Sequence, residues 1–142
     1  MMLTSQELTA TLREHGFKVT PQRLAVYEVL AGEKTHPSAE MLYSKLRPKY
    51  PSMSFATVYK TVEILHQLKL IQILNTGEDS YRYDADVSNH AHIQCTACGR
   101  VDDVQPLPLK ALQKTVAAET NYEVQGQQFY FFGICANCRQ QN

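Results

Sequence analysis

Residues 54–84 read SFATVYKTVEILHQLKLIQILNTGEDSYRYD, and this stretch decides the predicted fold. Ser54 is a suitable helix N-cap, and apolar residues at helical spacing follow it. A β-prone run at Leu70–Leu74, turn residues at 75–79 and a returning run at Ser80–Tyr83 then predict a two-stranded hairpin. After a series of helices, one more helix followed by such a hairpin is the order of a winged helix-turn-helix.

The helix after Ser54 has two predicted faces. The inward stripe consists of Phe55, Val58, Val62 and Leu65. The outer face consists of Thr57, Lys60, Thr61 and Ile64, with Tyr59 at the edge of the stripe. An outer face of this composition is suited to contact a partner.

Three more helices are predicted upstream, because apolar pairs at i, i+4 spacing lie between start and stop signals. Two such pairs are Leu8 with Leu12 and Leu42 with Leu46. The start signals are Thr20 with Pro21, and Ser38; the stop signals are Gly16, Gly32 and Pro48.

The second half of the chain is mixed. Strands are predicted at His90–Cys95, Arg100–Val104 and Val124–Ile134, and a helix at Leu109–Ala118. The hairpin ends near residues 84–89, where Asp, Ser and Asn cluster. We therefore expect an α+β protein with two domains, 1–84 and 85–142, the second being an α/β domain.

The net charge of the 142-residue chain is zero, but the charge is unevenly distributed. Residues 1–74 hold nine basic and six acidic side chains, whereas residues 75–142 hold five and eight. This split favours a basic module that meets a polyanion and an acidic module that holds cations, although small domains also differ this much by chance. The composition excludes a disordered tail, a collagen-like rod and a highly basic packaging protein.

No apolar run is long enough to span a membrane, and the first residues lack the pattern of a secretory signal. We therefore expect a cytoplasmic protein without a membrane partner. In such a compartment, four cysteines indicate metal or redox chemistry before disulfides.

The four cysteines form two CxxC pairs, Cys95 with Cys98 and Cys135 with Cys138. Two such turns supply four thiolates to one ion, which is the usual arrangement of structural Zn²⁺. Four thiolates leave no open position, so the predicted role is structural. Redox-active CxxC motifs or unrelated free thiols are the alternatives.

A second group combines histidine and aspartate. His90 and His92 are two residues apart and so share one face of a strand. Asp84 precedes them, Asp103 lies on the next predicted strand, and His36 lies before the third helix. The spacing is compatible with a second metal site or with ordinary surface and strand-end residues.

Four collinear motifs make the chain resemble the ferric uptake regulator (Fur) superfamily. They are Thr20–Arg23, His36–Glu40, Ala56–Lys60 and His90–Gly99. The resemblance covers essentially the whole chain. It implies a homodimeric transcription regulator with an N-terminal winged helix, a C-terminal dimerisation domain and a structural zinc site.

The resemblance also implies a regulatory metal site between the domains. Its ligand positions match His36, Asp84, His90, His92 and Asp103. Three imidazoles and two carboxylates suit Fe²⁺ or Mn²⁺ better than a small tetrahedral ion. Many members of the family have an extra metal site, built partly from residues around the His-x-His run and on the following helix. The corresponding positions here are Ala91, Lys110 and Gly126–Gln127, which are poor ligands, so no third site is expected.

Aspartate at both 84 and 103 makes the chain most similar to the peroxide-sensing (PerR) branch of the family. That branch implies release of DNA after iron-catalysed oxidation of His36 or His90. An iron-responsive repressor without peroxide sensing is the alternative within the family.

Contact with a palindromic operator is expected from two kinds of side chain. Lys18, Arg23 and Lys60 are candidates for phosphate or groove contacts, and Thr57, Tyr59 and Lys60 for base edges. No nucleophile motif, Gly-rich phosphate loop or separate general base is present, so no enzyme is expected. Two alternative functions belong to other classes of protein. One is a metalloenzyme, and the other is a zinc-stabilised protein-interaction module that does not bind DNA.

Overall fold

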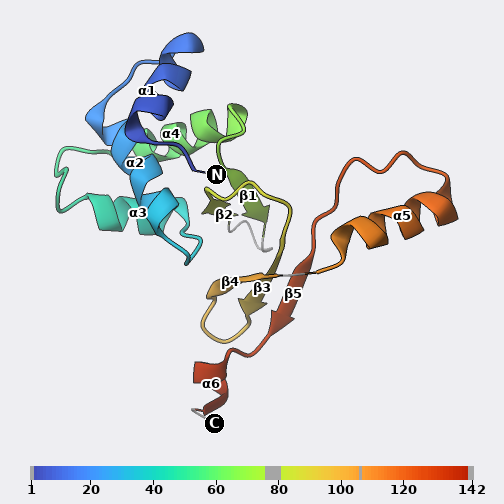
Figure 1. Ribbon diagram of the computed structural model, residues 1–142. Helices are drawn as coiled ribbons and strands as arrows, with labels where there is room; N and C mark the ends of the chain where they lie inside the picture. The colour runs from blue at the N-terminus through green and yellow to red at the C-terminus, as the bar shows by residue number, and fades with distance from the viewer. Residues whose placement is uncertain (1, 76–80, 106, 141–142) are drawn as a thin grey trace. The chain divides into compact units, whose positions relative to one another are not determined.

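The computed structural model describes residues 2–75, 81–105 and 107–140. The chain forms two compact units, Met1–Val87 and Ser88–Asn142, whereas the predicted boundary falls after residue 84 (Figure 1). The predicted hairpin turn, apart from Asn75, and the predicted strand residue Ser80 lie outside the described residues.

The described residues of the first unit form four helices and an antiparallel hairpin, in the order of a winged helix (Figure 1). In the hairpin, Ile73 is opposite Tyr83. The elements are α1 (Ser5–Glu14), α2 (Pro21–Gly32), α3 (Ala39–Leu46), α4 (Phe55–Gln67), β1 (Gln72–Asn75) and β2 (Tyr81–Asp84).

The predicted helix starts are confirmed by hydrogen bonds to side-chain oxygens. The hydroxyls of Thr20, Ser38 and Ser54 accept from backbone N–H groups three residues on, at 3.1, 3.2 and 3.1 Å. After α1, Gly16 adopts a φ of +79°, a conformation that glycine adopts without a Cβ penalty. Local chemistry therefore sets these boundaries.

The core of the first unit draws on all four helices and the hairpin. Val26, Leu42 and Val58 are fully buried, and Tyr83 on β2 packs into the same core. Burial raises the pKa of Tyr83 to about 12, with smaller contributions from Tyr59, Glu40, Glu63 and Tyr81.

Two predictions for the faces of α4 are wrong. Thr61 and Ile64, expected on the outer face, are buried, whereas Phe55, expected inside, is 39% exposed. Helix α4 packs against both α2 and α3, so its buried arc is wider than one stripe. Thr61 tolerates burial because its hydroxyl donates to the Thr57 carbonyl at 2.7 Å.

In the second unit, the part of the chain that the structure describes forms a three-stranded sheet in the order β4-β3-β5 and two helices (Figure 1). Strand β3 pairs antiparallel with β4 and parallel with β5. The elements are β3 (Ala91–Cys95), β4 (Val101–Val104), α5 (Leu109–Thr120), β5 (Tyr130–Gly133) and α6 (Ala136–Gln140).

The predicted long strand at Val124–Ile134 is wrong in extent. Only Tyr130–Gly133 forms a strand, because pairing with β3 is limited to four residue pairs. Helix α6 was not expected, since five residues are too few to show a helical period.

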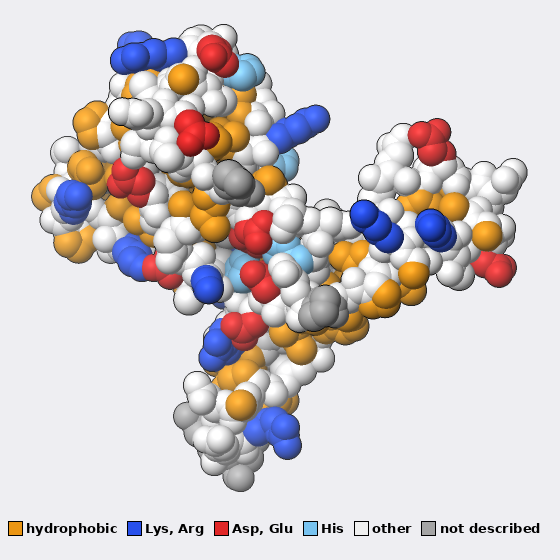
Figure 2. Space-filling model, viewed as in Figure 1, with side chains coloured by type: hydrophobic (Ala, Val, Ile, Leu, Met, Phe, Trp, Pro, Cys, Tyr) orange, Lys and Arg blue, Asp and Glu red, His pale blue; other side chains and the backbone are white. Residues whose placement is uncertain are grey.

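The second unit exposes much of its apolar side-chain surface. Leu112 and Val116 on α5 are 42% and 48% exposed, and Phe131 and Phe132 on β5 are 44% and 59% exposed. Figure 2 shows hydrophobic side chains gathered along this part of the surface. Within the described residues, no helix is long and apolar enough to cross a bilayer.

Candidate functional site

The four cysteines of the second unit converge on one point. Their Sγ atoms all lie within 4.8 Å of one another, although the two CxxC turns are far apart in sequence. The Sγ atoms of Cys98 and Cys135 are 3.8 Å apart, too far for a disulfide bond. Parallel pairing of β5 with β3 delivers the second turn to the first.

The backbone around Cys95 favours a thiolate. The N–H groups of Cys135 and Cys98 donate to the Cys95 sulfur at 3.3 and 3.5 Å. These hydrogen bonds, with that from Cys135 the largest cause, lower the pKa of Cys95 to about 6. Hydrogen bonding with the Cys135 thiol raises the pKa of Cys138 to about 12. Four sulfurs in this arrangement suit a soft tetrahedral cation, which stabilises all of them as thiolates.

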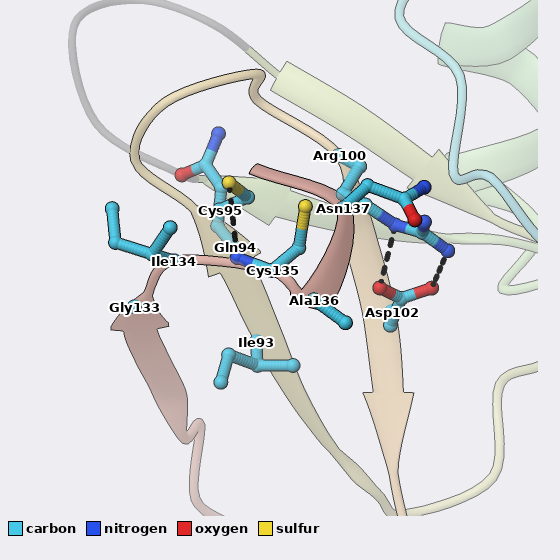
Figure 3. Close-up of a pocket in the computed structure, with 10 residues that line it drawn as sticks. All are labelled: Ile93, Gln94, Cys95, Arg100, Asp102, Gly133, Ile134, Cys135, Ala136 and Asn137. Atoms are coloured by element: carbon cyan, nitrogen blue, oxygen red, sulfur yellow. Dashed lines mark hydrogen bonds and ion pairs between the residues drawn. The ribbon is translucent and has the colours of Figure 1, made fainter. Parts of the chain in front are cut away.

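A cavity of about 320 Å³ lies beside the cysteine group, and Figure 3 shows Cys95 and Cys135 next to each other in its wall. On another side of the cavity, Arg100 and Asp102 form a two-pronged ion pair, with both N–O distances at 2.9 Å. These side chains are about half exposed, so the pair contributes little to stability.

On the sheet of the second unit, two imidazoles meet one carboxylate. The Nε2 atoms of His90 and His92 lie 3.0 and 3.3 Å from Oδ1 of Asp103, and the two rings are 4.4 Å apart. The strand register explains this, because His92 is paired with Asp103 across β3 and β4. His90 lies directly before β3, and its ring reaches the same carboxylate.

The tautomer of His90 follows from its surroundings. Its Nδ1 is 2.8 Å from the Ser88 carbonyl, which only accepts, so Nδ1 carries the proton. In the neutral ring, Nε2 then presents a lone pair toward the Asp103 carboxylate. The lone pair on His90 Nε2 and the Asp103 carboxylate repel each other unless a cation or a proton lies between them. This group of donors therefore fits a cation.

In the first unit, His36 and Asp84 form a corresponding pair. His36 Nε2 lies 3.2 Å from Asp84 Oδ2, and both side chains are buried. The other oxygen of Asp84 accepts from the Asp86 N–H at 2.9 Å, which orients the carboxylate. The structure thus brings the five predicted ligands together as two groups, one within each unit: His36 with Asp84, and His90 and His92 with Asp103.

The predicted DNA-contacting residues lie at the starts of α2 and α4. Lys18, Arg23 and Thr57 line one surface cavity of about 550 Å³. Tyr59 and Lys60 are exposed on α4, outside that cavity. Basic groups beside helix N-termini form a surface that attracts phosphate.

Four other residues line that cavity: Thr20 and Pro21 were predicted only as a helix start, Gln22 only as part of the Thr20–Arg23 motif, and Tyr50 was not predicted at all. Gln22 directly follows Pro21, and its place in the first turn of α2 was a usable indication. Tyr50 lies between α3 and α4, where no periodicity pointed to it.

The region considered for a third metal site carries amides. Gln113 donates to Gln127, and Gln127 donates to Asn89. Neutral amides are weak ligands compared with imidazole or thiolate. The absence of a third site stays a prediction.

A winged helix is a DNA-binding element, and a thiol quartet and imidazole–carboxylate groups are metal-binding ones, so the fold and the site define the class of metal-binding, DNA-binding proteins. The model of the Ferric uptake regulator family matches residues 14–132. The chain therefore belongs to the ferric uptake regulator family.

Individual relatives point the same way. Over 133 residues the chain is 44% identical to the transcriptional regulator PerR of Clostridium acetobutylicum, covering 94% of this chain and 96% of that protein. It is 32% identical over 134 residues to the peroxide-responsive repressor PerR of Staphylococcus aureus, covering 94% and 90%. The solved structure of the Helicobacter pylori ferric uptake regulator Fur, which has three functional metal-binding sites, superposes with a TM-score of 0.85 at 25% identity, covering 97% of this chain and 95% of that one.

Proposed function

We propose that this chain is a metal-dependent repressor that binds operator DNA as a homodimer and releases it when peroxide oxidises a metal ligand. The observation that carries the proposal is that each of two aspartates is paired with histidine: Asp84 with His36, and Asp103 with His90 and His92. The 44% identity to a PerR regulator supports it.

In this proposal the cysteine quartet holds Zn²⁺. Four sulfurs within 4.8 Å of one another form a closed set of ligands, and two backbone N–H groups already donate to Cys95. The ion links the C-terminal segment to β3, so its role is structural.

His36, Asp84, His90, His92 and Asp103 together hold Fe²⁺ or Mn²⁺ in this proposal. The support is the convergence of donors within each unit and the family's use of metals. Binding one ion with ligands from both units favours a single relative orientation of the units. That orientation sets the spacing of two α4 helices for a palindrome.

The DNA surface consists of Lys18, Arg23, Thr57, Tyr59 and Lys60 in this proposal. The exposed side chains of Tyr59 and Lys60 on α4 are available for base edges. Lys18 and Arg23 stand near the N-terminus of α2, where phosphate is favoured.

The second unit supplies the homodimer interface. Phe131 and Phe132 are exposed on opposite faces of β5, and apolar residues of α5 are exposed as well, so the unit presents apolar area that a second copy would bury. Among the described residues, β5 is paired on one side only, since the sheet order is β4-β3-β5.

When bound, iron(II) would give one electron to hydrogen peroxide, which yields hydroxide and a hydroxyl radical, and would regain one electron as the radical adds to a ligand ring and the ring loses a proton, so the net products are an oxidised histidine and water. His36 and His90 are the ligands that we expect to gain oxygen. An oxidised imidazole is a poorer ligand, so the two units lose their common anchor and the operator is released. We place this regulator in the cytoplasm.

An operator gel shift tests the proposal. Protein loaded with Fe²⁺ and protein loaded with Mn²⁺ should both bind, and peroxide should abolish binding only with Fe²⁺. Chelation should release DNA in both cases. Release on chelation without an effect of peroxide would instead indicate a plain iron-responsive repressor. Operator binding by metal-stripped protein would contradict the proposal that binding requires a metal.

Mass spectrometry provides the chemical readout. After peroxide, the Fe²⁺-loaded protein should carry an added oxygen on His36 or His90, and the Mn²⁺-loaded protein should not. Peptides with neither residue modified, from protein that has released DNA, would contradict the sensing mechanism.

A further inference from the structure

Strand β2 holds the loop that carries His36 at three consecutive residues. The Tyr83 N–H donates to the Pro37 carbonyl at 3.0 Å, and Asp84 contacts the His36 ring at 3.2 Å. Arg82, the residue before them, contacts the backbone of the same loop. The loop is thus fixed to the strand at both its main chain and its imidazole.

Arg82 donates a hydrogen bond to the carbonyl of His36, although the two residues are 46 positions apart in the sequence. Its Nη1 donates to that carbonyl at 2.8 Å and lies 3.4 Å from the Thr35 carbonyl. Arg82 and Asp84 are two residues apart on β2, so their side chains point to the same face of the strand. One face of the strand therefore holds both the backbone and the ring of His36.

The backbone of His36 needs such support. Its φ is +54°, in the left-handed region, which is uncommon for residues other than glycine. Pro37 follows directly and disfavours helical conformations of the preceding residue. A conformation of this kind persists where surrounding contacts hold it. The hydrogen bond from Arg82 to the carbonyl of this same residue is such a contact.

We propose that Arg82 is a positioning residue for the metal ligand His36: by holding the His36 carbonyl, it keeps the imidazole beside Asp84. This inference rests on the proposed function, in which His36 is a ligand. Residues that orient a ligand typically alter metal affinity by 10- to 100-fold when they are replaced.

The test is Mn²⁺ affinity of the full-length, zinc-loaded protein, measured by electron paramagnetic resonance of free Mn²⁺. Arg82→Met and Arg82→Gln should each bind about tenfold or more weakly than the wild type. Arg82→Lys keeps the charge and a donor, so it should recover part of the affinity. Arg13→Met removes an exposed guanidinium of the same unit and should change nothing.

A second readout needs no metal. In metal-free protein, the ring-nitrogen chemical shifts of His36 should move in Arg82→Gln and stay unchanged in Arg13→Met. If Arg82 only stabilised the hairpin, its loss would lower the unfolding midpoint of the first unit without changing either Mn²⁺ affinity or the His36 shifts of the folded protein.

His36→Ala separates the two possible failures. Wild-type Mn²⁺ affinity in His36→Ala would show that His36 is not a ligand, and the proposed function itself would fail. Weakened binding in His36→Ala, together with wild-type affinity and His36 shifts in Arg82→Gln, would overturn the positioning role alone. If Arg82→Met does not fold, Arg82→Gln and Arg82→Lys decide by the same criteria.

Discussion

The two units of this protein reach stability in different ways. The first buries apolar side chains from four helices and a hairpin around one core. Among the described residues of the second, the buried apolar side chains are Ala91, Cys95, Val101 and Leu109. So small a core does not offset the entropy of ordering the chain. We therefore expect the second unit to depend on a bound ion and on a partner copy, and the first unit to fold without either.

Removal of zinc should produce the largest effect. Cys98→Ser, or chelation of the wild type, should unfold the second unit, because structural zinc sites contribute on the order of 10 kcal/mol to folding. Hydrogen exchange should then lose protection on β3 and β5 while α2 and α4 stay protected. Retained protection on β3 in zinc-free protein would show that the second unit folds without the ion, as the first unit does.

A core truncation should act on the first unit alone. Leu42→Ala removes a fully buried side chain and should lower the free energy of unfolding of that unit by about 3 kcal/mol. Urea denaturation measures this. Zinc content should stay at the wild-type level, and a loss of zinc would show that the units are not independent.

The exposed apolar surface of the second unit should govern dimerisation. Phe132→Ser should raise the dimer dissociation constant at least tenfold, because aromatic residues dominate many interfaces. Analytical ultracentrifugation gives the constant. Met41→Ser is the matched control, since Met41 is 43% exposed but lies on α3 of the first unit. Equal effects of the two variants would argue against this surface.

The smallest expected change concerns DNA. Tyr59→Ala should weaken operator affinity about tenfold, since Tyr59 is 42% exposed on α4. Zinc content and dimerisation should be unaffected. Tyr122→Ala, at a 76% exposed tyrosine of the second unit, should bind as the wild type does in the same gel-shift titration.

Local features were predictable from the sequence, and features that depend on neighbours were not. The caps Thr20, Ser38 and Ser54 act within three residues, so the helix starts were correct. The burial of Thr61 and Ile64 depends on which helices pack against α4, and a single apolar stripe did not show that.

The features of the candidate site also divide into those that local spacing predicts and those that depend on tertiary structure. Spacing alone put His90 and His92 on one strand face and the cysteines in two pairs. That Asp103 stands opposite His92 is a matter of strand register, which the hairpin between β3 and β4 decides. No sequence pattern indicated a role for Arg82, because its partner, the His36 carbonyl, is 46 residues away in the sequence and belongs to the backbone.

By itself, the sequence determined the order of elements, the positions of helix starts and the identities of the donor groups, because these depend on residue type and short-range spacing. Only the tertiary structure decided which donors meet and which loop β2 holds. Contacts between residues far apart in the chain depend on strand register and packing, which no local pattern encodes. His36 illustrates both: its residue type was plain from the start, but its left-handed backbone and its attachment to Arg82 and Asp84 emerged only in three dimensions.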